Sequence, residues 1–199
     1  MSHGHGHGHG HGHGHDASQD GPAKYIAIFI SVLALCLAIS ETLAKSSQTS
    51  YIAKNVEAAN LWAFFQAKTI RRTSVETAAE ALALDVQLAR DPATKQLLEK
   101  RVADWKAQAQ RYRTEPETRE GSQELAARAK EAEKMRDKYL EQYHHFEVAS
   151  AAFQISIVLA GAYLLTHGVL LLWIAGGLST AGVAFTLIGL LFPSAVHLF

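Results

Sequence analysis

Hydrophobic positions along the chain form two continuous runs, separated by a long segment in which they recur with helical spacing. The longer run, Val148–Phe199, contains no Asp, Glu, Lys or Arg. One crossing of a bilayer takes about 20 apolar residues, so this run is long enough for two crossings. The polar triplet at 166–168 contains a glycine that can end a helix, and Pro193 stops the chain from continuing as a helix. The pattern therefore predicts a hairpin of membrane helices at 148–166 and 169–192.

The shorter run, Tyr25–Ser40, is uncharged and lies between Lys24 and Glu41. Extended through Ala44 it reaches the length of a membrane span. A cleaved signal peptide is the alternative interpretation. The preceding region is rich in His and Gly rather than basic, and residues 40–44 make a poor cleavage site, so we expect a retained membrane helix over 23–44.

The middle of the chain, residues 45–147, is rich in strong helix formers and carries few helix breakers. The breakers are Pro92, Pro116 and Gly121, which predict three helices. The first ends near Arg90. The second begins after Asp91, which is placed as its N-cap with proline at the first helical position. The third begins at Ser122 and runs without Gly or Pro into the second membrane helix.

Each of these helices has an apolar seam with steps of three and four residues. The seams are Val75, Ala79, Leu82 and Val86; Leu98, Val102, Trp105, Ala109 and Tyr112; and Leu125, Ala129, Ala132, Met135, Tyr139, Tyr143 and Phe146. The expected fold is an all-α membrane protein with three transmembrane helices. A long helical, coiled-coil-like extramembrane domain at 45–147 separates the first from the second, and a tail at 1–22 precedes them.

Charge divides the chain in the same way, although the net charge is zero. The middle segment holds every basic residue except Lys24 and every acidic residue except Asp16, Asp20 and Glu41. Both signs are mixed over the helix faces, which is typical of a solvated surface and not of a nucleic-acid site. Basic residues near the membrane ends of this segment predict that it is cytoplasmic. They are Lys45, Lys54, Arg128, Lys130, Lys134, Arg136 and Lys138.

The tail alternates histidine with glycine, which disfavours a stable helix or strand. Imidazoles two residues apart on a flexible chain can converge on zinc, nickel or copper, so a divalent metal is a candidate partner, and no cofactor is required. A solvated spacer or a tag is the alternative interpretation. The candidate ligands are His3, His5, His7, His9, His11, His13 and His15.

The most distinctive local sequence is N-L-W-A-F-F-Q-A-K at residues 60–68. On a helix Leu61 and Phe65 share a face, whereas Phe64 points about 100° away, so this helix needs more than one neighbour. Gln66 and Lys68 could form hydrogen bonds or bind an anion, or they could be ordinary polar contacts. The candidate packing and polar residues are Asn60, Trp62, Phe64, Phe65, Gln66 and Lys68.

This segment, placed after a first membrane helix and before a charged helical region and a terminal hydrophobic hairpin, resembles the bacterial family described as domain of unknown function 4337. The resemblance covers about residues 20–195. It implies a multi-pass protein of the bacterial inner membrane. It implies no activity and no catalytic residues.

Several other residues are candidates for function or packing, each with a structural alternative. Cys36 is expected to be a buried, inert thiol. Glu41 is the carboxylate nearest a membrane helix, and ionisable groups there are functional hypotheses. Gln154 is expected to hydrogen-bond between helices and His167 to lie at a wet turn, while Glu141, His144 and His145 make a weak metal candidate. A small-residue cluster predicts close helix packing, with pore lining as the alternative: Gly176, Gly177, Ser179, Ala181 and Gly182.

No nucleophile elbow, phosphate-binding loop, HExxH or CxxC motif occurs in the sequence, so we expect no enzyme. The leading hypothesis is an assembly or scaffold protein of the bacterial inner membrane that acts through self-association or partner binding. A small channel or transporter, with Glu41 and the small-residue face near the path, is one alternative. Divalent-metal handling through the tail is another.

Overall fold

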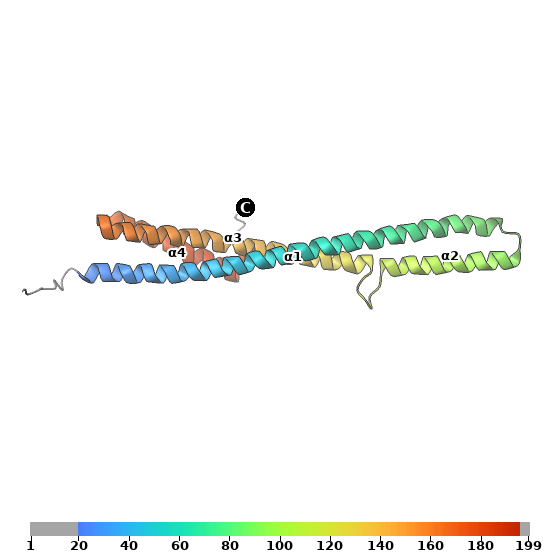
Figure 1. Ribbon diagram of the computed structural model, residues 1–199, viewed down its shortest axis with the longest axis horizontal. Helices are drawn as coiled ribbons and strands as arrows, with labels where there is room; N and C mark the ends of the chain where they lie inside the picture. The colour runs from blue at the N-terminus through green and yellow to red at the C-terminus, as the bar shows by residue number, and fades with distance from the viewer. Residues whose placement is uncertain (1–19, 196–199) are drawn as a thin grey trace, which may run out of the picture. The chain divides into compact units, whose positions relative to one another are not determined.

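A computed structural model describes residues 20–195, and this part of the chain is helical without strands (Figure 1). The helices are α1 (Asp20–Leu88), α2 (Pro92–Arg113), α3 (Ser122–Thr166) and α4 (Val169–Leu191), followed by a 3₁₀ turn, η1 (Pro193–Ala195). Three of them, α1, α3 and α4, are long and apolar enough to cross a membrane. The all-helical fold with three candidate membrane spans is therefore confirmed.

The helix boundaries follow the breakers in the sequence. Asp91 caps α2, since its Oδ2 accepts hydrogen bonds from the Thr94 backbone N–H at 2.8 Å and from the Thr94 hydroxyl at 2.6 Å. These two bonds favour the ionised carboxylate and lower the pKa of Asp91 below its ordinary value. Helix α3 begins at Ser122 and continues for 45 residues into the apolar segment without interruption. Both boundaries and the continuity of α3 agree with the sequence prediction.

The left-handed residues at the two helix breaks are not glycines. At the end of α3 the left-handed residue is His167, with φ of 56°, and not Gly168. In the loop between α2 and α3 it is Arg119, with φ of 57°, and not Gly121. Gly121 is needed for close approach, because a Cβ there would lie 2.6 Å from the Glu115 nitrogen. The prediction that Gly168 itself ends the helix was therefore wrong, although the position of the break was right.

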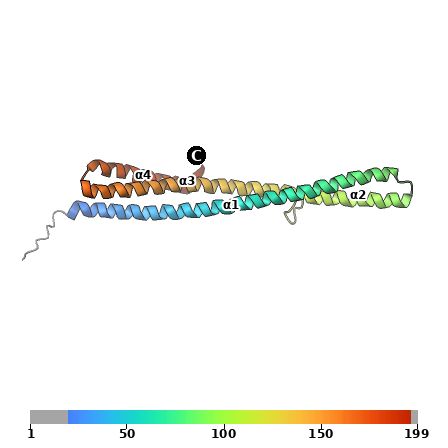
Figure 2. The same ribbon diagram turned by 45° about the horizontal axis from the view of Figure 1, so that its top comes forward.

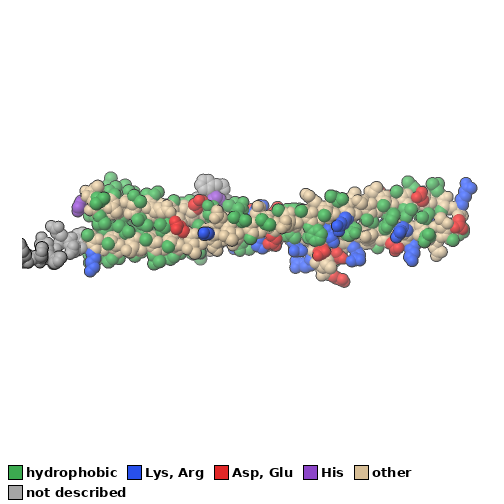
Figure 3. Space-filling model, viewed as in Figure 1, with side chains coloured by type: hydrophobic (Ala, Val, Ile, Leu, Met, Phe, Trp, Pro, Cys, Tyr) green, Lys and Arg blue, Asp and Glu red, His purple; other side chains and the backbone are tan. Residues whose placement is uncertain are grey.

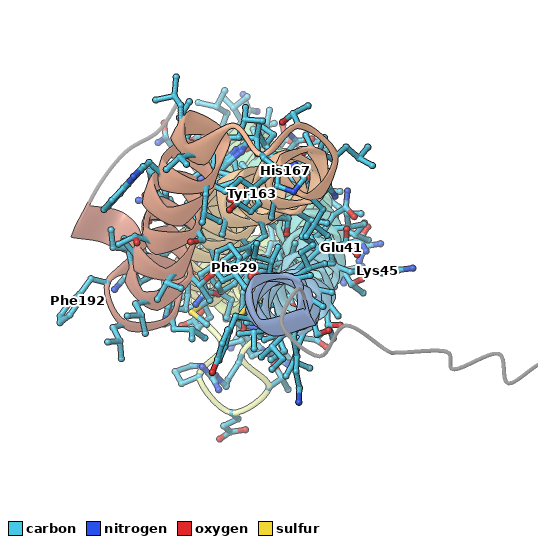
Figure 4. The ribbon with its side chains drawn as sticks, turned by 90° about the vertical axis from the view of Figure 1, so that its left-hand side faces the viewer. Phe29, Glu41, Lys45, Tyr163, His167 and Phe192 are labelled. Atoms are coloured by element: carbon cyan, nitrogen blue, oxygen red, sulfur yellow. The ribbon has the colours of Figure 1, made fainter. Side chains whose placement is uncertain are left out.

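Contacts divide the chain into two compact units, and the first contains residues 20–40 and 148–185. Its core consists of two clusters. The first joins α1, α3 and α4 through Ile26, Ala160 and Ala175, with Phe29 and Tyr163 among their neighbours. The second joins α1 and α3 through Leu33, Ala149 and Phe153, with Cys36 among their neighbours. Figure 4 labels Phe29, Tyr163 and His167 in this unit, and the rings of Tyr163 and His167 lie 6.2 Å apart. Cys36 is half-buried among apolar side chains and not fully buried as expected.

The second unit contains residues 41–147 and 186–195 and is built as an antiparallel pair of helical segments. In Figures 1 and 2, α2 and the first part of α3 follow one another along α1 and run in the opposite direction to it. The loop 114–121 projects between them without reversing the chain. Its ends are joined by the Ser122 hydroxyl, which donates to the Arg113 carbonyl at 3.4 Å, and by the Thr114 hydroxyl, which donates to Gln123 at 2.9 Å. A compact surface loop with adjoining ends is an Ω-loop.

The apolar seams face the interior of this second unit. Ala79, Ala109, Leu125, Ala129, Ala132 and Phe146 are buried, and the remaining seam residues are half-buried. One core cluster joins α1 and α3 through Ala58, Leu61, Leu125, Ala129 and Ala132. The seams are thus occupied by contacts within the chain.

Candidate functional site

The segment 60–68 lies on α1 in the second unit, where the neighbour of α1 changes from α3 to α2. Leu61, Trp62 and Phe65 belong to the side that packs against α3. The indole N–H of Trp62 donates to Glu133 Oε1 at 2.9 Å, and the rings of Trp62 and Phe65 meet edge to face at 5.4 Å. A tryptophan with its body in an apolar cluster and its N–H on a carboxylate fixes the rotation of α1 against α3.

Lys68 lies one turn further along α1, and only 7% of its surface is exposed. Its Nζ is 3.7 Å from Glu115 Oε2 and 3.8 Å from Glu120 Oε2. These carboxylates stand near the two ends of the Ω-loop. The same nitrogen lies 5.5 Å from the ring centre of Phe64 and 5.7 Å from that of Tyr112, within the range of a cation–π contact. Lys68 therefore connects α1, α2 and both ends of the loop.

Arg111 completes this ion-pair network. Its Nη2 donates to Glu115 Oε1 at 2.8 Å. Hydrogen bonds from Arg111 first and from Thr118 second favour the ionised form of Glu115 and hold its pKa below the ordinary value of 4.5. The same bond raises the pKa of Arg111.

A cleft of about 470 Å³ opens beside the network. Its lining carries both signs of charge, and Lys68 and Arg111 each face a carboxylate. The arrangement therefore fastens a loop and offers little uncompensated charge to an anion. Within residues 20–195 no group of three or more His, Cys, Asp or Glu side chains is placed to hold a metal ion. The lining residues are Lys68, Asp104, Ala107, Gln108, Arg111, Tyr112 and Glu115.

The other polar candidates are dispersed. Asn60 and Gln66 are exposed on α1, away from the inward seam. Glu41 is also exposed, and it lies beside Lys45 on one side of α1 (Figure 4). His145 is buried, with Nε2 3.0 Å from the Pro193 carbonyl, and so connects α3 to the turn η1 that follows α4 within the second unit.

The small-residue cluster of α4 contributes one close contact in the first unit. A Cβ at Gly182 would lie 2.9 to 3.1 Å from the ring of Phe153, whereas Gly176 and Gly177 have open space. In the second unit Gly189 has the same role, because a Cβ there would lie 2.9 Å from Phe146. The sequence analysis did not identify Gly189. The signal was its spacing, because the buried Ala175, Gly182 and Gly189 follow one another at intervals of seven residues.

The charged side chains visible in Figure 3 gather over the second unit, and the face of the first unit seen there is almost entirely uncharged. The candidate metal ligands His3 to His15 lie outside the described residues. No structural statement applies to them, and metal binding by the tail stays a prediction.

These features define a class of protein: a helical chain with three candidate membrane spans and a polar helical unit in which a buried lysine fastens an Ω-loop. The chain belongs to the family described as Domain of unknown function (DUF4337), whose model matches residues 22–192. The resemblance seen in the sequence is thus confirmed. No curated protein and no solved structure matches the chain.

The ion pair between Arg111 and Glu115 should make the Ω-loop sensitive to acid. A carboxylate whose pKa is lowered by folding contributes stability above its unfolded-state pKa, and this contribution is lost as the pH falls through the folded-state pKa. We therefore expect the loop to be fastened at pH 7 and at pH 5, and to loosen below the ordinary value of 4.5. A carboxyl NMR titration of the detergent-solubilised protein checks this. Arg111→Gln should shift the Glu115 titration to higher pH; an unchanged midpoint would contradict the pairing.

Proposed function

We propose that the protein is a non-enzymatic assembly protein of the bacterial inner membrane and acts through association of its helical second unit. The observation that carries the proposal is a set of large apolar side chains on α1, each more than half exposed and located beyond the predicted first span. They are Ile52, Val56, Ile70, Leu84 and Leu88. Exposed apolar patches of this kind mark interaction surfaces.

The architecture explains why this surface is left uncovered. The second unit pairs α1 with α2 and α3 on one side, so the inward seams are already filled. Association therefore requires another face, and α1 has one. The polar network at Lys68 supports a structural role for the unit, because its charges are used in pairs that hold the loop.

The proposed localisation is supported by the composition and by the resemblance to the family. The bacterial family supports the inner membrane. The basic residues near the membrane ends of the middle segment support a cytoplasmic second unit. In this orientation the exposed face of α1 is available to other copies and to cytoplasmic proteins.

The experiment that tests the proposal is a mass measurement of the intact protein in a mild detergent, with the detergent contribution subtracted. We expect a multiple of the 21.7 kDa chain mass. Ile70→Glu should shift the protein towards the monomer, because it places a charge on the exposed face of α1. Leu97→Glu is the matched control, since Leu97 is an equally exposed leucine on α2. A wild-type protein that is strictly monomeric at every concentration would refute the proposal.

A further inference from the structure

Helix α1 carries a second heptad repeat on the face opposite its inward seam. We call it the outer line. From Val56 to Leu88 the steps alternate strictly between four and three residues, every position is exposed, and none is charged. A regular repeat of this length over more than four heptads is typical of a coiled coil. The outer line consists of Val56, Asn60, Ala63, Ala67, Ile70, Ser74, Thr77, Ala81, Leu84 and Leu88.

The outward faces of the neighbouring helices differ from this face. On α2 the exposed Leu97 is followed on its line by Arg101 and Asp104. On α3 the outward positions near Lys134 and Lys138 are charged. The outer line is therefore specific to α1 and is not the ordinary surface of this unit.

We propose that the outer line is the contact between two copies of this chain, which pack as a parallel, in-register coiled coil through α1. The inference rests on the proposed function and specifies its interface. A line with steps of three and four matches a helix with the same repeat, and a second copy supplies one. Copies inserted in a bilayer with one orientation present α1 in the same direction, because α1 is a single helix that carries both the predicted first span and the outer line.

Asn60 supports this register. In the heptad repeat of the outer line the d positions are those of Val56, Ala63, Ile70, Thr77 and Leu84, and Asn60 occupies an a position. A single asparagine at an a position favours the parallel, in-register dimer, because the two amides can then hydrogen-bond to each other. The next three a positions, at Ala67, Ser74 and Ala81, are small and allow close approach of the two helices, and the last a position is Leu88. The register thus gives the exposed Asn60 a role in the contact between the two copies.

The same register brings two like charges together. Glu80 occupies a g position and Asp85 an e position, and in a parallel pair g of one helix faces the following e of the other. Glu80→Lys should therefore strengthen the pair by placing a cation opposite Asp85 of the second copy. Glu76→Lys makes the same change of charge on an exposed c position and should leave the association unchanged.

Cysteine cross-linking tests the interface in the full-length protein. The background is Cys36→Ala, and single cysteines replace Ala67, Ile70, Ser74 and Ala81 on the outer line, with Glu76 and Lys106 as exposed control positions. All are exposed, so the substitutions disturb no core contact. Under mild oxidation in native membranes we expect at least about tenfold more disulfide-linked dimer at the outer line than at the controls, since a and d positions face each other across the pair.

The mass measurement on the same samples separates the outcomes. The inference is supported if the yield of disulfide-linked dimer is high at the outer-line positions, which repeat every seven residues, and rises further with Glu80→Lys. An oligomer whose cross-links are equal at all positions, or absent from the outer line, overturns the inference and leaves the proposed function standing. A monomer without cross-links overturns both.

Discussion

Gly182→Leu is expected to destabilise the first unit strongly, whereas Gly177→Leu on the same helix should cost almost nothing. A Cβ at Gly182 already lies within 2.9 to 3.1 Å of three atoms of the Phe153 ring, and Phe153 is 1% exposed, so the ring has little room to move. Overpacking of this kind costs about 1–3 kcal/mol or more. Gly177 has no atom within 4 Å of its Cβ position, and leucine is the better helix former there.

The measurement is the midpoint of thermal unfolding in detergent, monitored by circular dichroism. For a chain of this size we expect Gly182→Leu to lower the midpoint by about 5 °C or more. The cost should fall in the background of Phe153→Ala, because removal of the ring relieves the clash, and the two changes should therefore not be additive. Equal midpoints for Gly182→Leu and Gly177→Leu would show that α4 does not pack on α3 through this face.

This contrast also shows how far the sequence alone predicts the fold. Long uncharged runs and isolated breakers act locally, so the candidate spans, the N-cap at Asp91 and the continuity of α3 follow directly from residue order. The rotation of α4 does not, because several small residues could face α3. Only the contact with Phe153 distinguishes Gly182 from Gly176 and Gly177.

The direction of the chain after the Ω-loop could not be predicted from the sequence either. Pro116 and Gly121 predicted a break between α2 and α3, and the break is present. Whether the chain reverses there depends on contacts between distant residues, chiefly those of Lys68 with Glu115 and Glu120. The cation–carboxylate pairs join α1 to a loop nearly fifty residues away, and nothing in the local sequence indicates them.

The two faces of α1 illustrate a further limit. Both faces have heptad spacing, and the sequence analysis identified the inward seam because valine and leucine are frequent in it. The outer line is the longer repeat, but alanine and serine occupy four of its ten positions. Burial separates the two faces: Ala79 on the inward seam is 1% exposed, whereas Ile70 on the outer line is 66% exposed.

Lys68→Glu is expected to release the Ω-loop. The substitution places a third carboxylate beside Glu115 and Glu120, in a position where the native side chain is nearly buried. A buried charge without a partner of opposite sign costs about 3 kcal/mol or more. Lys68→Met keeps most of the side-chain volume and removes only the charge, so the two carboxylates can turn towards water and the loss should be smaller.

Trypsin cleavage after Arg119 in the intact protein measures the release, because Arg119 lies inside the loop. When opening is fast relative to cleavage, the rate follows the population of the open loop, and we expect at least about a tenfold increase for Lys68→Glu. Adding Glu120→Gln should slow cleavage again, since it removes one of the two carboxylates that repel the introduced one and keeps the pair of Arg111 with Glu115. Cleavage of Lys68→Glu at the wild-type rate would show that the loop is held by its own bonds to α3, such as that between Thr114 and Gln123, and that the buried lysine serves α1 alone.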